Sequence, residues 1–186
     1  MEISKDVLAA LIDGKLDWER TKAIISGEKD LDRFDKYIEI LQERVPWKEK
    51  IVLPLGEHLY IVQKDREYVV KCDCGYEFGD YRVNWKLNAL IHVRDTKEKL
   101  LEVYPYPESP GLPDPEYCNI REFYCPNCGA LLEVEAVPKF YPIIFDFLPD
   151  LGTFYSDWLN RPLPFPTEFK DLTYDVTKEW RKELEE

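Results

Sequence analysis

Two short stretches decide how this chain folds: Cys72-Asp73-Cys74-Gly75 and Cys125-Pro126-Asn127-Cys128-Gly129. They hold four of the five cysteines, and a glycine directly follows each pair. Glycine adopts positive φ without strain, so the backbone after each pair can turn back and point N–H groups at thiolate sulfurs. This is the local chemistry of a metal knuckle, and four thiolates from two knuckles suit a tetrahedral Zn²⁺ ion.

The predicted zinc ligands are therefore Cys72, Cys74, Cys125 and Cys128. Roughly fifty residues separate the two pairs, which a zinc ribbon tolerates because the entropy of loop closure grows only logarithmically with length. The first pair is tighter than the usual Cys-x-x-Cys, so a site with Asp80 or His92 in place of one cysteine, and a chain without metal, stay open as alternatives. A catalytic zinc needs an open coordination position, which four thiolates do not leave, so the predicted zinc is structural.

Other roles for the cysteines fit less well. The Cys125–Cys128 pair resembles a thiol redox motif, but a strand-like run follows Gly129, whereas a redox motif opens a helix that lowers the thiol pKa. A rubredoxin-like iron site is disfavoured by the short first pair, and Cys118 is expected to have no chemical role. Neither histidine belongs to a zinc-protease motif and no phosphate-binding loop is present in the sequence, so no catalytic or cofactor-binding residue is predicted.

Composition narrows the class of protein. The 186 residues allow one central domain with extensions, and 25 Lys and Arg against 37 Asp and Glu give a formal charge of −12. Such an acidic chain is a poor partner for nucleic acid or an anionic membrane, because both recognise cationic surfaces. The sequence shows no membrane-spanning run or signal peptide, so we expect a cytoplasmic protein, in which clustered cysteines indicate metal rather than disulfides.

The order of patterns along the chain predicts an α+β fold. Helices are expected from Ser4 to Gly14, from Asp17 to Gly27 and from Asp30 to Val45, where apolar residues recur at helical spacing. Period-two patterns then predict an antiparallel β meander, and a zinc-ribbon hairpin flanks the second knuckle. The expected strands are 51–55, 58–63, 67–71, 85–93, 119–124 and 130–137. For 85–93, a helix that uses Val83, Leu87 and Leu90 stays open as the alternative.

Two less regular regions complete the prediction. Asp95 and Glu98 form a capping box for a helix over 96–104, and five prolines then predict an irregular loop over 105–115. Aromatic residues and prolines crowd the stretch after Pro138, where we expect at most a short helix over 153–160 and a charged helix over 176–186. The expected regions are a helical part (1–47), a β and zinc-ribbon domain (48–137) and an extended aromatic arm (138–186), with some aromatic rings on a partner's surface.

Several of these stretches together resemble one family, the gamma subunit of acetone carboxylase. The resemblance runs in order from about Gly14 to Pro164, and the stretch after Pro166 goes beyond it. Its most specific parts, besides the two knuckles, are Tyr37–Trp47, Ile51–Gly56, Asn84–Leu87, His92–Thr96, Ile120–Tyr124, Tyr141–Ile143, Asp146–Phe147 and Trp158–Leu159.

The resemblance implies a small zinc-containing structural subunit of an ATP-dependent ketone carboxylase, which converts acetone and bicarbonate to acetoacetate. Larger alpha and beta subunits, related to hydantoinases and oxoprolinases, would carry the chemistry with ATP and Mn²⁺ or Mg²⁺, and this chain would be non-catalytic. The alternative that the residues alone support is a zinc-ribbon interaction module of an unrelated complex.

Overall fold

The chain begins with three helices. The computed structural model describes residues 3–104 and 112–185, and its first elements are α1 (Lys5–Ile12), α2 (Trp18–Ser26) and α3 (Arg33–Arg44). Ser4 and Asp17 cap the first two helices by accepting hydrogen bonds from backbone N–H groups of the first turn. The helices bury a small apolar cluster of their own, which contains Ile3, Leu8, Ile24 and Ile40.

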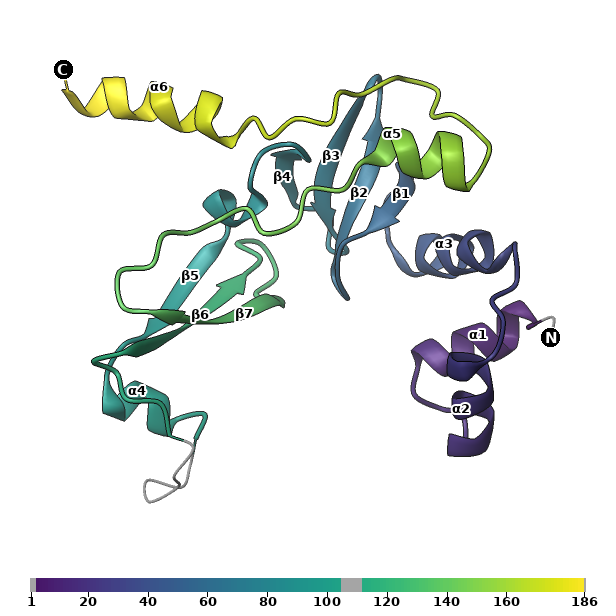
Figure 1. Cartoon of the computed structure of the whole chain (residues 1–186), viewed down its shortest axis with the longest axis horizontal. Coiled ribbons are helices and arrows are strands. Elements are labelled where there is room, and N and C mark those ends of the chain that lie inside the picture. Colours follow the sequence, from purple (N-terminus) through teal and green to yellow (C-terminus); the bar gives the residue numbers. More distant parts are fainter. Residues whose placement is uncertain (1–2, 105–111, 186) are drawn as a thin grey trace.

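A four-stranded antiparallel sheet, here called sheet A, follows α3. Its strands lie in sequence order: β1 (Lys50–Pro54), β2 (Leu59–Lys64), β3 (Glu67–Cys72) and β4 (Glu77–Asp80). Both faces are buried, because Ile61 and Val70 point to one apolar cluster and Val62 and Val69 to another. Leu41 of α3 packs on the second face, and α5, near the end of the chain, lies beside the sheet (Figure 1).

A second antiparallel sheet, sheet B, has three strands with β6 in the centre. Its order is β5 (Leu90–Arg94), β6 (Cys118–Tyr124) and β7 (Leu131–Pro138), and α4 (Lys97–Leu101) follows β5. The 3₁₀ turn Trp85–Asn88 leads from sheet A to sheet B. Trp85 and the fully buried Phe123 of β6 meet edge to face, 6.1 Å between ring centroids, so this pair joins the two sheets in one core.

The chain then returns from sheet B to sheet A through an extended segment, residues 139–150, here called the arm (Figure 1). Arg121 of β6 holds its start by donating to the backbone carbonyls of Tyr141 and Pro142, at 3.0 and 3.2 Å. The arm ends in α5 (Leu151–Thr153), which continues into a π-helical turn, Phe154–Trp158. After a second extended stretch, α6 (Thr173–Glu185) projects away from the sheets.

One buried lysine ties the arm to sheet B. The Lys86 side chain is 1% exposed, and its Nζ donates to Glu133 at 2.7 Å, to Glu135 at 2.6 Å and to Asp146 of the arm. The Arg121 guanidinium lies 3.2 Å from the second carboxylate oxygen of Glu135. A buried cation is tolerated here because it is fully paired with carboxylates.

Most expectations about the fold are confirmed. The chain is α+β, its three N-terminal helices and the strands of the meander form, and the second knuckle lies at the turn of the β6–β7 hairpin. The loop expected over 105–115 lies largely outside the described residues, and its end, residues 112–115, has no helix or strand. Within residues 3–104 and 112–185, none of the helices combines the length and the apolar character that a bilayer crossing requires.

Several details differ from the expectation. The single strand expected over 85–93 is a 3₁₀ turn and a shorter strand, since the Asn84 side chain caps the turn by accepting from Lys86 N–H. β4 was not predicted, and α3 begins at Arg33 rather than Asp30. Thr96, not Asp95, caps α4, which ends at Leu101. The last helix begins at Thr173, before the expected start at 176.

Candidate metal centre

The two knuckles have the same construction, and each lies at the turn of a hairpin. The first joins β3 to β4 in sheet A, and the second joins β6 to β7 in sheet B. In each, the glycine N–H donates to the carbonyl of the first cysteine at 2.9 Å, from Gly75 to Cys72 and from Gly129 to Cys125. The glycines take φ of 99° and 73°, the left-handed region that glycine enters without strain.

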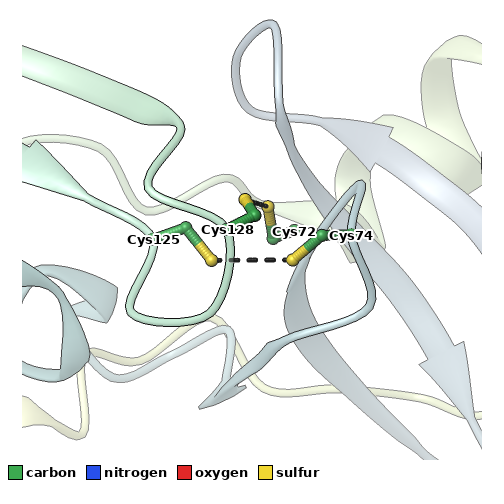
Figure 2. Close-up of side chains that lie close together, drawn as sticks. All are labelled: Cys72, Cys74, Cys125 and Cys128. Atoms are coloured by element: carbon green, nitrogen blue, oxygen red, sulfur yellow. Dashed lines mark hydrogen bonds between the residues drawn. The ribbon is translucent and has the colours of Figure 1, made fainter.

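The four sulfurs meet between the two sheets (Figure 2). The Sγ atoms of Cys72 and Cys128 are 3.8 Å apart, those of Cys74 and Cys125 are 3.7 Å apart, and all four lie within 4.8 Å of one another. None is in a disulfide. A tetrahedron with zinc–sulfur bonds of about 2.3 Å has sulfur–sulfur edges of about 3.8 Å, so the donor set fits a Zn²⁺ ion.

The structure brings together the four predicted ligands and leaves the alternatives apart. Asp80 instead hydrogen-bonds to the backbone and guanidinium of Arg82. His92 is exposed on β5. Cys118 lies at the start of β6, and its sulfur hydrogen-bonds to the Asn119 carbonyl at 3.8 Å. The four-sulfur set is therefore complete without a substituted ligand.

The four thiols differ in burial, and burial and hydrogen bonding shift the pKa of Cys72 and of Cys74 in opposite directions. Cys72 and Cys125 are fully buried, Cys74 is half-buried and Cys128 is exposed. Burial raises the pKa of Cys72. Burial also acts to raise the pKa of Cys74, but hydrogen bonds from the Asn127 amide and the Tyr76 backbone N–H outweigh it and lower that pKa to about 7. Asn127 thus stabilises a thiolate on the opposite knuckle, as an outer partner of a metal ligand does.

Comparison with known proteins identifies the family of the chain. The family model of the acetone carboxylase gamma subunit matches residues 45–159. The acetone carboxylase gamma subunit of Xanthobacter autotrophicus is 46% identical over 166 residues, which cover 88% of this chain and 97% of that protein. The chain belongs to the acetone carboxylase gamma subunit family.

A more distant relative carries a different name. The acetophenone carboxylase beta subunit of Aromatoleum aromaticum is 30% identical over 114 residues, which cover 61% of this chain and 80% of that protein. Both relatives are named as carboxylase subunits. The part that matches the acetone carboxylase gamma subunit family contains both sheets, both knuckles and the arm, and excludes α1, α2, α3 and α6.

Two residues that support the first knuckle were not predicted from the sequence. The Trp47 indole Nε1 lies 3.2 Å from the Cys72 carbonyl and 3.0 Å from the Asp73 carbonyl, so it donates to both. His58 Nδ1 lies 2.6 Å from the Asp73 carboxylate. Neither contact leaves a local sequence signal, because Trp47 is 25 residues from Cys72 and His58 is 15 from Asp73. Only the spacing of the cysteines is visible in the sequence.

Replacing Trp47 with phenylalanine is expected to lower the free energy of unfolding by about 1–2 kcal/mol, because two knuckle carbonyls lose their shared donor while the ring volume is largely kept. Urea denaturation followed by circular dichroism measures the change. Trp18→Phe is the matched control, since that indole is 67% exposed, and its effect should stay within about 0.5 kcal/mol. Equal denaturation midpoints for the two variants would contradict the role of Trp47.

Proposed function

We propose that this chain is the small, non-catalytic, zinc-bearing subunit of a hetero-oligomeric, ATP-dependent ketone carboxylase. The observation that carries the proposal is the family membership over 45–159 together with a complete four-thiolate site inside that range. Four protein ligands leave no coordination position for a substrate, so a bound zinc would hold the two sheets together rather than take part in the reaction.

Other features support a role as a subunit. Large apolar side chains remain exposed on this chain: Trp18, Leu31, Tyr117, Phe140, Phe147, Trp158, Phe169 and Tyr174 are each more than half exposed. Exposed aromatic side chains in such number are typical of protein–protein interfaces. The relatives are named as subunits of acetone and acetophenone carboxylases, which supports a ketone as the substrate class of the whole enzyme.

The larger subunits would carry the reaction. They are proposed to be alpha and beta subunits related to hydantoinases and oxoprolinases, which bind ATP and Mn²⁺ or Mg²⁺ and join a ketone to bicarbonate, giving acetoacetate from acetone. The acidic charge of −12 supports protein partners over nucleic acid or a membrane surface. A cytoplasmic location fits a site of reduced cysteines.

Co-expression of the tagged chain with the two larger subunits tests the proposal. The expected result is one assembly that contains all three chains, one zinc per copy of this chain, and ATP hydrolysis that requires both ketone and bicarbonate. A chain that binds zinc but stays apart from the larger subunits would contradict the proposal and favour an interaction module of another complex. Full carboxylase activity without this chain would contradict it as well.

A further inference from the structure

Sheet B has one face that the described part of the chain covers only at one end, where Ile120 is buried and Arg94 donates to the Lys99 carbonyl of α4. The register of its strands places side chains of β5, β6 and β7 in rows across the sheet, with Leu90 beside Tyr124 and Leu131, and His92 beside Glu122 and Val134. Paired residues point to the same side of a sheet. We call this side the outer face; its members are Leu90, His92, Arg94, Ile120, Glu122, Tyr124, Leu131, Val134 and Ala136.

The opposite face of sheet B is already used. It carries the buried Phe123, and its Glu133 and Glu135 bind Lys86, while Arg121 holds the arm. The outer face is different, because Leu90, Leu131 and Val134 are 57%, 45% and 52% exposed. The rows place these three residues on the same face, with Tyr124 between Leu90 and Leu131 and with Glu122 beside Val134.

The outer face also presents no unpaired charge. Its two charged residues, Arg94 and Glu122, bind each other at 2.9 Å, and their side chains are 11% and 8% exposed. The Tyr124 hydroxyl donates a further hydrogen bond to Glu122 at 3.0 Å. Of all residues in the chain, 33% are charged, yet this face has no charged side chain without a partner. A second protein could therefore cover the face without desolvating an unpaired charge. The cores of protein–protein interfaces are typically poor in charged residues.

The net charge of the chain indicates which kind of protein could bind to the outer face. A second copy would bring another −12 to the same contact, and the two acidic bodies would repel each other around the apolar centre. A different protein with an apolar patch surrounded by Lys and Arg would be attracted instead. The outer face lies within 45–159, the part shared with the family, whereas the exposed Trp18, Ile25 and Leu31 lie outside it.

We propose that the outer face of sheet B is the docking surface for a larger, heterologous subunit, which covers Leu90, Leu131 and Val134 with an apolar patch bordered by basic residues. The inference rests on the proposed function and deepens it, because it names the surface through which the chain joins the assembly. The zinc site would then hold this sheet at a fixed angle to sheet A.

Val134→Lys in the three-subunit assembly tests this surface. Val134 is half exposed in the isolated chain, so the variant folds, and an ammonium in the middle of the interface is expected to weaken association by about thirtyfold or more. Leu31→Lys, at a fully exposed apolar position of the N-terminal region, is the control and leaves association unchanged. Higher salt is expected to weaken association of the wild-type chain, as charge complementarity requires.

The outcomes separate the two proposals. If the wild-type chain does not join the larger subunits, the proposed function fails. If the wild-type chain joins them and Val134→Lys joins equally tightly, the docking surface alone is overturned. If the isolated chain forms a dimer that Val134→Lys dissociates, the occupant is a second copy and the heterologous partner is excluded.

Discussion

Cys128→Ser is expected to release the zinc ion and to lower the stability of the chain by about 4 kcal/mol, the value that corresponds to a thousandfold weaker metal affinity. Cys128 is the exposed cysteine of the four. Serine has nearly the same size, and at an exposed site it leaves no cavity, so without a metal the change would cost no more than about 0.5 kcal/mol. A large loss of stability can then come only from the lost ligand, since metal binding is also folding free energy.

Metal content by inductively coupled plasma mass spectrometry and thermal unfolding, both on the full chain, measure the two effects. The matched control is Cys118→Ser, because this fifth cysteine makes no sulfur contact with the cluster and hydrogen-bonds only to the neighbouring Asn119 carbonyl. Its zinc content and melting temperature should equal those of the wild type. A Cys128→Ser chain with full zinc content and unchanged melting would show that the four sulfurs do not hold a metal.

The candidate site could be predicted from the sequence because its determinants are local. Each cysteine pair and its glycine form one turn, and hairpin patterns on either side of Cys125 and Cys128 fixed where that turn lies. The sequence could not reveal that the first knuckle is also a hairpin turn. Its second strand, β4, has only four residues and contains Gly79 at a φ of 101°, so it lacks the alternation that identifies a strand.

The segment around Trp85 shows the limit of periodicity. Alternation over 85–93 predicts a strand, and a lysine in such a pattern is usually solvated. In the structure the Asn84 cap turns the chain into a 3₁₀ turn, and Lys86 becomes 1% exposed. Its partners lie 47 to 60 residues away, and no pattern within a short window carries that information. Long-range ion pairs of this kind require the three-dimensional arrangement.

Lys86 is the position where substitution is expected to have the second large effect. Glu133, Glu135 and Asp146 bring carboxylate oxygens within 4.8 Å of one another around its ammonium group. Burial acts to lower the pKa of Lys86, but the hydrogen bonds that its ammonium group donates to the three carboxylates outweigh it and raise the pKa to about 12. The stability that this pairing contributes is therefore complete below the ordinary lysine pKa and is lost only as the pH rises through about 12.

Lys86→Met is expected to lower the free energy of unfolding by about 3 kcal/mol at neutral pH, because three carboxylates, with side chains 29%, 12% and 46% exposed, lose the buried cation that they share. This loss of stability is at the low end of the values found when one partner of a buried ion pair is removed, because Arg121 still pairs with Glu135. Urea denaturation measures it, and Lys64→Met is the matched control, because Lys64 pairs with Glu77 at 2.6 Å but is 46% exposed. That control should lose less than about 1 kcal/mol.

The pH dependence distinguishes lost pairing from lost packing in Lys86→Met. Burial already raises the pKa of Glu133 in the wild type, and without the ammonium group it rises further. Protonation of the folded state on acidification then relieves the repulsion, so the stability deficit of Lys86→Met should shrink as the pH is lowered from neutral into the acidic range. Glu133→Gln in the Lys86→Met background should recover part of the loss at neutral pH. A deficit that is the same at neutral and at acidic pH and unaffected by Glu133→Gln would mean that Lys86 acts through the packing of its side chain rather than through its ion pairs.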